Sequence, residues 1–506
     1  MVQTSNDNRR IAKNTLFLYC RMIIIMLVTL YTSRVVLKTL GIEDYGIYNV
    51  VGGIVAMFGF ISGSLTSASQ RYITFELGKG KTGNLSKIFS LSLELHVILS
   101  ITLSLIIEPL GIWFIHNKLL IPIERLNAAL WVFHLSVLSM IVMFISVPYN
   151  ALIVAYEKMN AFAMVAIIEA ILRLLIAYSL LVCGDFDKLI IYSILMFLVQ
   201  LIIRFCYTIY CKKNIPDCSF TPIYDKKVLI EMGSFASWSI FGNIAFVTYT
   251  QGLNLLLGTF FLPIVNSARG IAVQVQSAIN TFVSGFQTAI NPQITKNYAA
   301  GNINEMVSLL FRSSRFSYYL LMIMTIPVVL QTETVLRIWL HTIPAYTISF
   351  LRVILLTTWI NSIANPLIIA VKATGRVRLY EMTVGGLMLF ILPVSYVFLR
   401  FGFPPITVFI VHLFIECIAM TFRIWNCKKL IHFSLYSYFS KVIFRIFIVT
   451  ISAIILPIIV QENFCRSGFL SLCVISILSI LCSIVSIFLF GLTQSERSFI
   501  ISKFKK

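Results

Sequence analysis

Apolar segments long enough to cross a membrane recur from one end of this 506-residue chain to the other. A helix needs about 20 predominantly apolar residues to span a hydrocarbon core of about 30 Å. Only 12% of the residues are charged, against about 25% in soluble domains. Strands of a membrane barrel alternate with a period of two, whereas segment 190–203 (IIYSILMFLVQLII) does not. The pattern predicts an all-α polytopic membrane protein.

The apolar segments divide the chain into about 14 predicted transmembrane helices. Their approximate limits are 14–37, 45–67, 88–115, 126–149, 161–183, 189–210, 231–256, 265–289, 308–331, 346–371, 379–399, 405–425, 442–461 and 468–491. Lysine and arginine are concentrated in alternate loops, and cytoplasmic loops are the ones that carry this excess. Both termini are therefore predicted to be cytoplasmic.

The formal net charge of +20 follows from this loop bias. No soluble domain carries the contiguous basic stripe that nucleic-acid binding requires, so we expect no nucleic-acid partner. No loop is long enough to hold a sizeable catalytic site, so we do not expect an enzyme.

Two phrases occur twice in the same order. The stretch SASQRYITFELGKGK at 67–81 resembles TAINPQITKNYAAGN at 288–302, which sets Gly80 on Gly301. The pattern Asn-x-Leu-Ile-[Val/Ile]-Ala sets Asn150 on Asn365. The two offsets differ by six residues, which a shorter loop in the second copy would absorb. Chance similarity between apolar sequences is the alternative, but the shared order favours an internal repeat.

The repeat predicts two pseudo-symmetric six-helix bundles followed by two extra helices. We expect an N-terminal bundle over 1–210, a cytoplasmic hinge linker over 211–230 and a C-terminal bundle over 231–426. Residues 427–506 hold the two extra helices and a cytoplasmic tail. Each bundle has an even number of spans, so both have the same orientation, as in transporters that work by alternating access.

The predicted helix at 265–289 has a polar face. Its side chains recur at spacings of three and four residues and are Gln274, Ser277, Asn280, Thr281, Ser284 and Gln287. Polar groups at membrane depth usually face a bundle interior or an aqueous cavity, and amides and hydroxyls suit a sugar. A dry interhelical hydrogen-bond seam is the alternative. In the alignment that sets Gly80 on Gly301, the residues of this face correspond to small residues of the second span, among them Gly53 and Gly59.

Four arginines within or next to spans are candidates for binding an anion, because a guanidinium matches phosphate geometry. They are Arg21, Arg34, Arg173 and Arg269. Arg173 follows Glu169 by one helical turn, so a structural ion pair is its alternative role. Arg21 has no such local partner.

No cofactor or metal is expected. Coupling to H⁺ or Na⁺ is left open, and the deep groups that could carry it are Glu94, Glu169, His412 and Glu416. Structural pairing is the commoner fate of such groups.

Three stretches together resemble the Wzx-type polysaccharide (O-antigen and capsule) flippases of the multidrug/oligosaccharidyl-lipid/polysaccharide exporter superfamily. They are LGIEDYGIYNVVGGIVAMFGF at 40–60, SASQRYITFELGKGK at 67–81 and PYNALIVAYEKM at 148–159. The resemblance implies a bacterial inner-membrane protein that moves a polyprenyl-diphosphate-linked oligosaccharide to the periplasmic leaflet by alternating access. It also implies contact with membrane lipids and with a polysaccharide polymerase, and a cationic cavity that Arg21, Arg34 and Arg269 match in kind.

A multidrug and toxin-efflux antiporter, coupled to a cation, is the alternative on the same fold. It should carry acids and aromatic residues in the cavity of its first half. The first two spans carry arginine and glycine instead, and no deep Asp or Glu, which favours the flippase.

Overall fold

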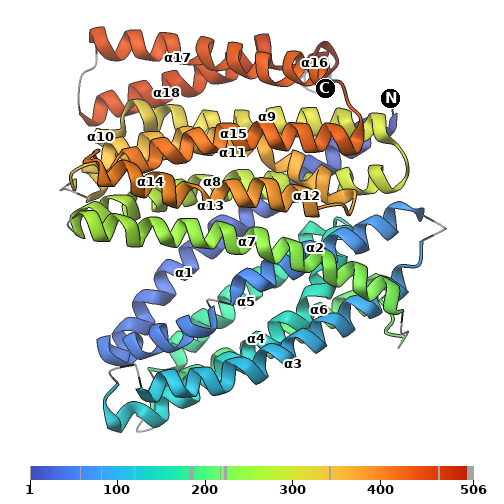
Figure 1. Cartoon of the computed structure of the whole chain (residues 1–506), viewed down its shortest axis with the longest axis vertical. Helices are drawn as coiled ribbons and strands as arrows, with labels where there is room; N and C mark the ends of the chain where they lie inside the picture. Colours follow the sequence, from blue (N-terminus) through green and yellow to red (C-terminus); the bar gives the residue numbers. More distant parts are fainter. Residues whose placement is uncertain are drawn as a thin grey trace. The chain divides into compact units, whose positions relative to one another are not determined.

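A computed structural model describes residues 2–56, 58–80, 83–117, 119, 121–181, 187–216, 218–221, 225–261, 263–340, 343–464 and 468–498. Within these ranges, the side chains of 2–16, 29, 30, 33, 34, 37, 42, 54, 56, 263 and 464 are not described. The described residues are almost entirely helical and contain no strand (Figure 1). The predicted all-α class is confirmed.

The chain forms two compact units, residues 1–243 and 244–506. The first unit contains α1 (Val2–Ala56), α2 (Gly59–Gly78), α3 (Leu85–Asn117), the short η2 (Ile123–Arg125), α4 (Leu126–Ala155), α5 (Met159–Ser179), α6 (Lys188–Asn214) and the first part of α7 (Lys226–Phe260). Gly41 divides α1 with a positive φ of 82°, a conformation that glycine adopts without a steric penalty. The division corresponds to the predicted turn between the first two spans.

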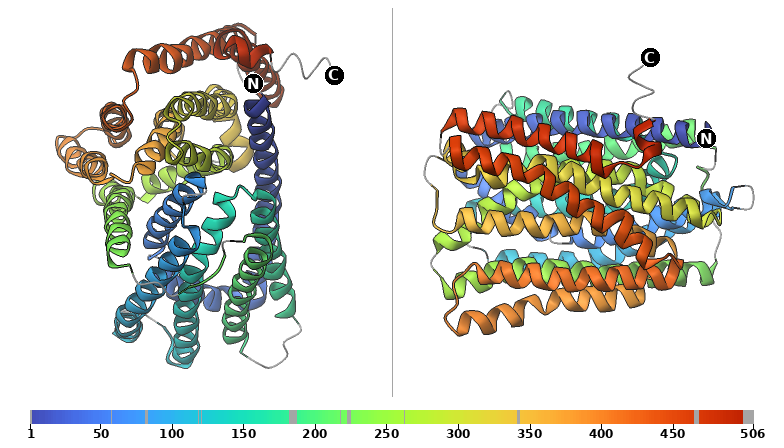
Figure 2. Two further views of the ribbon diagram at one scale, coloured as in Figure 1. Left: turned by 90° about the vertical axis from the view of Figure 1, so that its right-hand side faces the viewer. Right: turned by 90° about the horizontal axis from the view of Figure 1, so that it is seen from above.

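The second unit contains the rest of α7, then α8 (Pro263–Ala299), α9 (Ile303–Leu330), α10 (Thr332–Leu340) and α11 (Thr347–Ala373). An interrupted span follows, built from α12 (Arg378–Tyr380), the π-helical η3 (Glu381–Gly385), α13 (Gly386–Leu389) and α14 (Ile391–Arg400). The remaining elements are α15 (Thr407–Ile431), α16 (Leu435–Tyr438), η4 (Phe439–Ile443), α17 (Phe444–Phe464), α18 (Phe469–Ser486) and η5 (Ile487–Gly491). Helices α17 and α18 lie side by side, and α18 packs on α9 (Figure 2).

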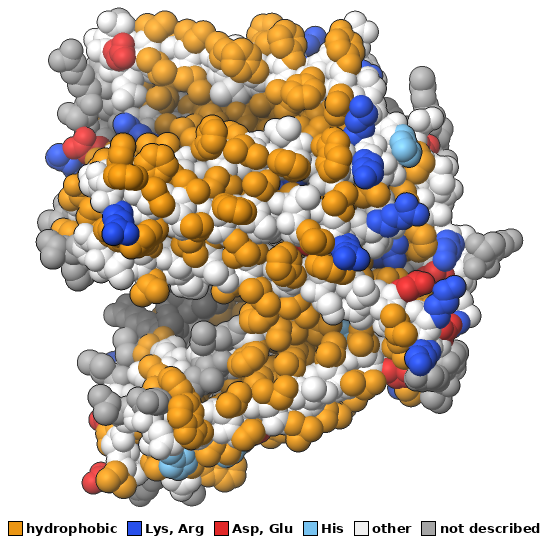
Figure 3. Space-filling model, viewed as in Figure 1, with side chains coloured by type: hydrophobic (Ala, Val, Ile, Leu, Met, Phe, Trp, Pro, Cys, Tyr) orange, Lys and Arg blue, Asp and Glu red, His pale blue; other side chains and the backbone are white. Residues whose placement is uncertain are grey.

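Eleven helices in the described part of the chain are long and apolar enough to cross a membrane. The first, second and eighth predicted spans are not among them. The second is interrupted between Ala56 and Gly59, and α8, which forms the eighth, has the polar face. Apolar side chains cover much of the helix surface in Figure 3, with Lys and Arg mainly toward the helix ends. The predicted number of about 14 transmembrane helices is consistent with the structure.

The repeat is visible in the turns, but its register differs from the predicted one. Gly80 and Gly301 follow α2 and α8 and both have positive φ, 62° and 77°. The next connection is three residues shorter in the second unit, 300–302 against 79–84. From there the offset is 218, so Pro148 corresponds to Pro366.

The turns after α4 and α11 support this offset, because Glu157 (φ 56°) and Gly375 (φ 77°) also match. The predicted pairing of Asn150 with Asn365 is therefore wrong by three residues. A shift of three residues is close to one helical turn. The two possible alignments therefore place nearly the same helix faces on each other, and the apolar residues match almost equally well in both.

The segment predicted as a hinge linker is fastened to the first unit. Ser86 on α3 accepts a hydrogen bond from Ser219, 3.2 Å between the two Oγ atoms. The Thr221 backbone N–H donates to Ser90 Oγ at 3.0 Å. Lys87 Nζ lies 2.7 Å from Asp225 Oδ2. The predicted domain limits remain a prediction, and the boundary between the two units lies inside α7.

Candidate functional site

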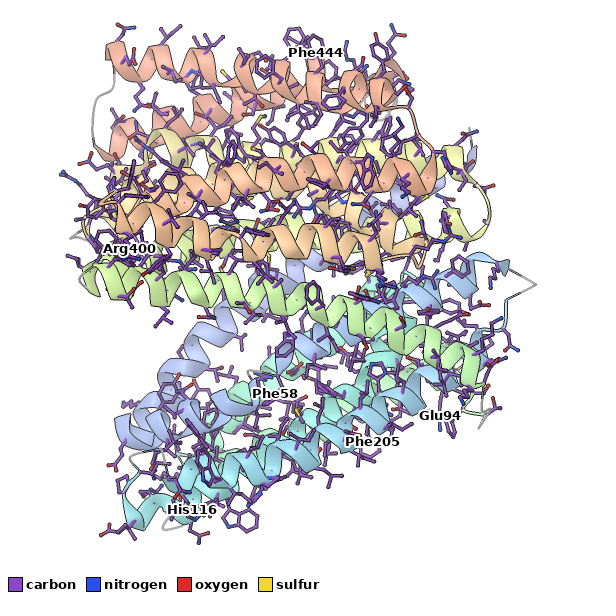
Figure 4. All side chains as sticks on the ribbon, in the orientation of Figure 1. Phe58, Glu94, His116, Phe205, Arg400 and Phe444 are labelled. Carbon is purple, nitrogen blue, oxygen red and sulfur yellow. The ribbon has the colours of Figure 1, made fainter. Side chains whose placement is uncertain are left out.

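The first unit encloses a cavity of about 490 Å³. Helices α1, α4, α5 and α6 supply most of its wall, and Phe58, labelled in Figure 4, lines it between α1 and α2. The polar lining residues are Tyr48, Asn49, Ser136, Ser139, Arg173, Ser193 and Gln200. The apolar ones are Val55, Leu135, Met140, Met143 and Met196, with Gly52, Gly53 and Gly59. None of the lining residues is Asp or Glu.

Glycines keep this cavity open. A Cβ atom on Gly53 or Gly59 would meet no other atom within 4 Å. Packing therefore does not require glycine at these positions, since tight helix contacts would place neighbouring atoms close to the missing Cβ. The small residues of the second span thus leave space in the cavity of the first unit.

Among the described residues that line the cavity, Arg173 is the only one with a charged side chain. Its Nη2 donates to Glu169 Oε1 at 2.5 Å, one turn earlier on α5. Its Nε is buried and has no hydrogen-bond partner in the described structure. Tyr48 on α1 and Tyr192 on α6 pack edge to face with ring centroids 4.8 Å apart, and both lie within electrostatic range of Arg173. Arg173 is thus both paired and open to the cavity.

Arg21 lies on α1 near the same ion pair. Its guanidinium carbon is 4.3 Å from the ring centroid of Phe162 on α5, and Tyr207 and Glu169 are within its electrostatic range. Its Nε is buried without a hydrogen-bond partner among the described residues. The structure therefore brings both Arg21 and Arg173 within electrostatic range of the Glu169 carboxylate. The side chain of Arg34 lies outside the described residues.

The polar face of α8 is exposed over most of its length. Gln274, Ser277, Asn280, Thr281 and Ser284 are all exposed. The hydroxyls of Thr281 and Ser284 donate to backbone carbonyls of their own helix.

Gln287 differs from the rest of this face. It is buried, and its Nε2 donates to Ser317 Oγ at 3.1 Å and to the Ser362 carbonyl at 3.2 Å. It joins α8 to α9 and α11 and does not line an open surface.

Arg269 is also held inside the second unit. Its guanidinium donates to Asn254 Oδ1 and, at 2.8 Å, to the Thr250 carbonyl, both on α7. It is 8% exposed. Its contacts tie α8 to α7, so it contributes no open anion site in this structure.

The candidate coupling groups have separate surroundings. Glu416 is buried and pairs with Arg423 on its own helix, α15. His412 packs on Tyr249, with ring centroids 5.1 Å apart, and its Nε2 is buried without a hydrogen-bond partner in the described structure. Glu169 pairs with Arg173. Glu94, labelled in Figure 4, is partly exposed on α3 and is not part of the cavity wall.

Sequence reasoning missed most of the polar cavity wall. Ser136 and Ser139 are three residues apart on α4, and Ser193 and Gln200 are seven apart on α6. Both spacings place the side chains on one helix face, a signal present in the sequence but weak beside the many lone serines of apolar helices. Among the described residues, no group of three or more His, Cys, Asp or Glu could hold a metal ion.

No family model matches the chain, and no curated protein matches it. Solved structures do. The outward-facing conformation of a multidrug resistance MATE family transporter of the MOP superfamily is 14% identical, with a TM-score of 0.70 over 84% of this chain and 96% of that one. The Vibrio cholerae MATE transporter VcmN in its bent form is 14% identical, with a TM-score of 0.67 over 85% and 98%.

A third similar structure is a MOP superfamily transporter from Pyrococcus furiosus, in which reverse polarity of the binding pocket suggests a different function. It is 14% identical, with a TM-score of 0.65 over 83% of this chain and 97% of that one. At these identities the likeness concerns the fold. The chain has the fold of MATE transporters of the MOP superfamily and is a multi-pass membrane protein.

Proposed function

We propose that this transporter exports an anionic amphiphile by alternating access, and that its substrate is a polyprenyl-diphosphate-linked oligosaccharide. The observation that carries the proposal is the charge of the first-unit cavity. Arg173 is the charged group among the described lining residues, and none of these residues carries a carboxylate. A cavity with this balance attracts an anion such as a diphosphate and disfavours a cation.

The polar face of α8 supports a glycan as the rest of the substrate. Sugars present many hydroxyl groups, and the exposed amides and hydroxyls of Gln274, Ser277 and Asn280 can both donate and accept hydrogen bonds. The lipid tail of the substrate would stay in the bilayer. The bacterial inner membrane as location, both termini in the cytoplasm and a polysaccharide polymerase as partner belong to the same proposal.

Multidrug efflux coupled to a cation is the second candidate function. The comparisons favour it, because one of the similar solved structures is described as a multidrug resistance transporter. The cavity also carries Met140, Met143 and Met196 beside Phe58, and flexible methionines suit substrates of varied shape. The Pyrococcus furiosus transporter indicates that pocket polarity differs within this fold, so the fold alone does not decide the substrate's charge.

Reconstitution into liposomes separates the two functions. One set of liposomes carries a radiolabelled lipid-linked oligosaccharide, scored by its accessibility to an external glycosidase, and the other carries ethidium, scored by its efflux. We expect translocation of the glycan lipid and loss of that activity in Arg21→Ala and Arg173→Ala at unchanged protein level. Ethidium efflux without glycan translocation would establish the second candidate instead.

A further inference from the structure

Glu169 pairs with Arg173 and also lies within electrostatic range of Arg21. Its Oε1 accepts from Arg173 Nη2 at 2.5 Å, and Arg21 is within electrostatic range on the neighbouring helix. Two guanidinium groups face one carboxylate, so the cluster carries a net charge of about +1. A guanidinium has five N–H donors, and the Nε of each arginine is buried without a hydrogen-bond partner in the described structure. The cluster has more donors than its one internal anion can fill.

The contact between Glu169 and Arg173 is open to exchange. The Arg173 side chain is 43% exposed and that of Glu169 28% exposed. Ion pairs with this much exposure are weak, because solvent screens them and holding two long side chains together costs entropy. A second anion that reaches Arg173 from the cavity can therefore replace the carboxylate without leaving a deeply buried charge unpaired.

Further hydrogen-bond donors line the same cavity as Arg173. They are the Tyr48 hydroxyl and the amides of Asn49 and Gln200, and the Tyr48 ring packs edge to face on Tyr192. Their hydroxyl and amide groups can donate to an anion with several oxygens. Glu169 has only two oxygens and is fixed to α5, so it cannot fill this set.

We propose that the Glu169 carboxylate is an internal competitor for the Arg173 guanidinium, and that an arriving phosphate-type anion displaces it. The displaced carboxylate then pairs with Arg21, which in this structure is stacked on Phe162. Glu169 thereby keeps Arg173 oriented while the cavity is empty, and it sets the affinity that an anion must exceed. This inference rests on the proposed anionic substrate and adds a specificity-determining residue to its site.

The direction in which Glu169→Gln changes the anion affinity tests the proposal. Full-length protein in nanodiscs of zwitterionic lipid is titrated calorimetrically with inorganic pyrophosphate and, separately, with farnesyl diphosphate. Removing the internal competitor in Glu169→Gln should tighten binding of both by at least about threefold. Glu169→Ala should do the same, and it guards against a folding defect specific to the glutamine. Arg173→Gln should abolish binding.

Glu124→Gln is the matched control, because it removes one carboxylate from an exposed position of the same unit and should leave both affinities unchanged. Tighter binding of farnesyl diphosphate alone would also support the proposal and would identify the ligand as a lipid headgroup. Weaker or unchanged binding of both anions in Glu169→Gln would overturn it. So would saturable binding of tetraphenylphosphonium that Glu169→Gln abolishes, since Glu169 would then be a cation ligand.

The binding assay and the transport assay can each reject one proposal without rejecting the other. Tighter pyrophosphate binding in Glu169→Gln, together with no glycan translocation by the wild type, would keep the exchange at Arg173 and reject the lipid-linked glycan. Glycan translocation by the wild type with unchanged binding in Glu169→Gln would do the reverse.

Discussion

Single glycines decide where the first unit is open and where it is closed. A Cβ atom on Gly59 would point into free space, whereas on Gly111 it would lie 2.0 Å from Cζ of Phe133. Both glycines occupy helices, so neither choice is explained by helix propensity, which disfavours glycine. Gly59 preserves space for a ligand, and Gly111 lets the fully buried Phe133 ring of α4 pack against α3.

Filling the cavity should stop transport without unfolding the protein. We expect Gly59→Leu to reduce translocation of the substrate at least tenfold, because its side chain would occupy part of the 490 Å³ cavity that the ligand needs. The melting temperature should change little. Gly46→Leu is the control, since a Cβ there also meets nothing within 4 Å and Gly46 does not line the cavity. Full activity of Gly59→Leu would exclude this cavity from the transport route.

Gly111→Ala should act on stability instead. The added methyl group has to displace a buried aromatic ring, and such overpacking costs about 1–3 kcal/mol. Thermal unfolding in detergent should therefore begin at a lower temperature than in the wild type. Gly233→Ala on α7, where a Cβ meets no atom within 4 Å, should be neutral. Equal melting temperatures for the two variants would contradict the packing described for α3 and α4.

Arg125 joins three connections of the first unit. It donates to Asp44 at 2.8 and 2.5 Å and to Asp187 at 2.7 and 3.2 Å. Asp187 also caps α6 by accepting from the backbone N–H groups of Leu189 and Ile190. Burial alone would raise the pKa of Asp187, but these hydrogen bonds outweigh it and hold the pKa below the ordinary 3.8.

Arg125→Gln should lower the free energy of unfolding by about 1–3 kcal/mol, because charge-assisted hydrogen bonds are lost. A lowered folded-state pKa gives stability that is complete above the ordinary Asp pKa of about 4 and is lost as the pH falls through the folded-state value. The difference between wild type and variant should therefore shrink in melting curves taken from about pH 6 down to about pH 3. As a control, Arg337→Gln breaks an exposed pair with Glu333 and should have almost no effect on stability. A stability difference between wild type and Arg125→Gln that stays constant at all pH values would show that Asp187 does not cause it.

Helix α8 shows how far a periodic pattern predicts a surface. Its spacing of three and four residues identified the polar face, and the structure leaves most of that face exposed. Gln287 fits the same spacing but turns inward to Ser317 and Ser362. Periodicity gives a direction around one helix, and only the positions of α9 and α11 decide which end of that face is covered.

Cysteine labelling can test this division of α8. Ser277→Cys and Asn280→Cys should react with a membrane-impermeant thiol reagent in the purified protein, because both positions are exposed. Gln287→Cys should stay unreactive in the folded protein and react after denaturation. Resistance of all three positions would indicate the dry hydrogen-bond seam between helices that the sequence left as the alternative.

The sequence predicted elements better than it predicted sites. Helix class, the polar face of α8 and the duplication follow from patterns within one helix or between two copies of a phrase. The cavity does not, because its wall combines side chains from α1, α4, α5 and α6 that lie more than 100 residues apart, such as Tyr48 and Gln200. Arg269 was predicted to bind an anion, but its contacts with Asn254 and Thr250 depend on how α7 and α8 pack.

At the level of the whole chain, the linker offers a test of where movement occurs. Ser86 and Ser219 have their Oγ atoms 3.2 Å apart, so cysteines at both positions should form a disulfide in a background without the native cysteines. The linker is fastened to α3, and we expect the oxidised protein to keep its transport activity. Inactivation on oxidation, reversed by a reducing agent, would place the hinge in the linker after all.

The corrected register of the repeat has a consequence for how the two halves diverged. At the offset of 218, Glu169 and Arg173 fall on Leu387 and Ile391, which carry no charge. Before the shortened connection the offset is still the one that sets Gly80 on Gly301, and there Gln274 and Asn280 of α8 fall on Gly53 and Gly59. The turn geometry is thus shared by the two copies, whereas the ion pair of Glu169 with Arg173 and the amides Gln274 and Asn280 each occur in one copy only. A chimaera of two first halves would accordingly have two charged chambers and no surface suited to a sugar.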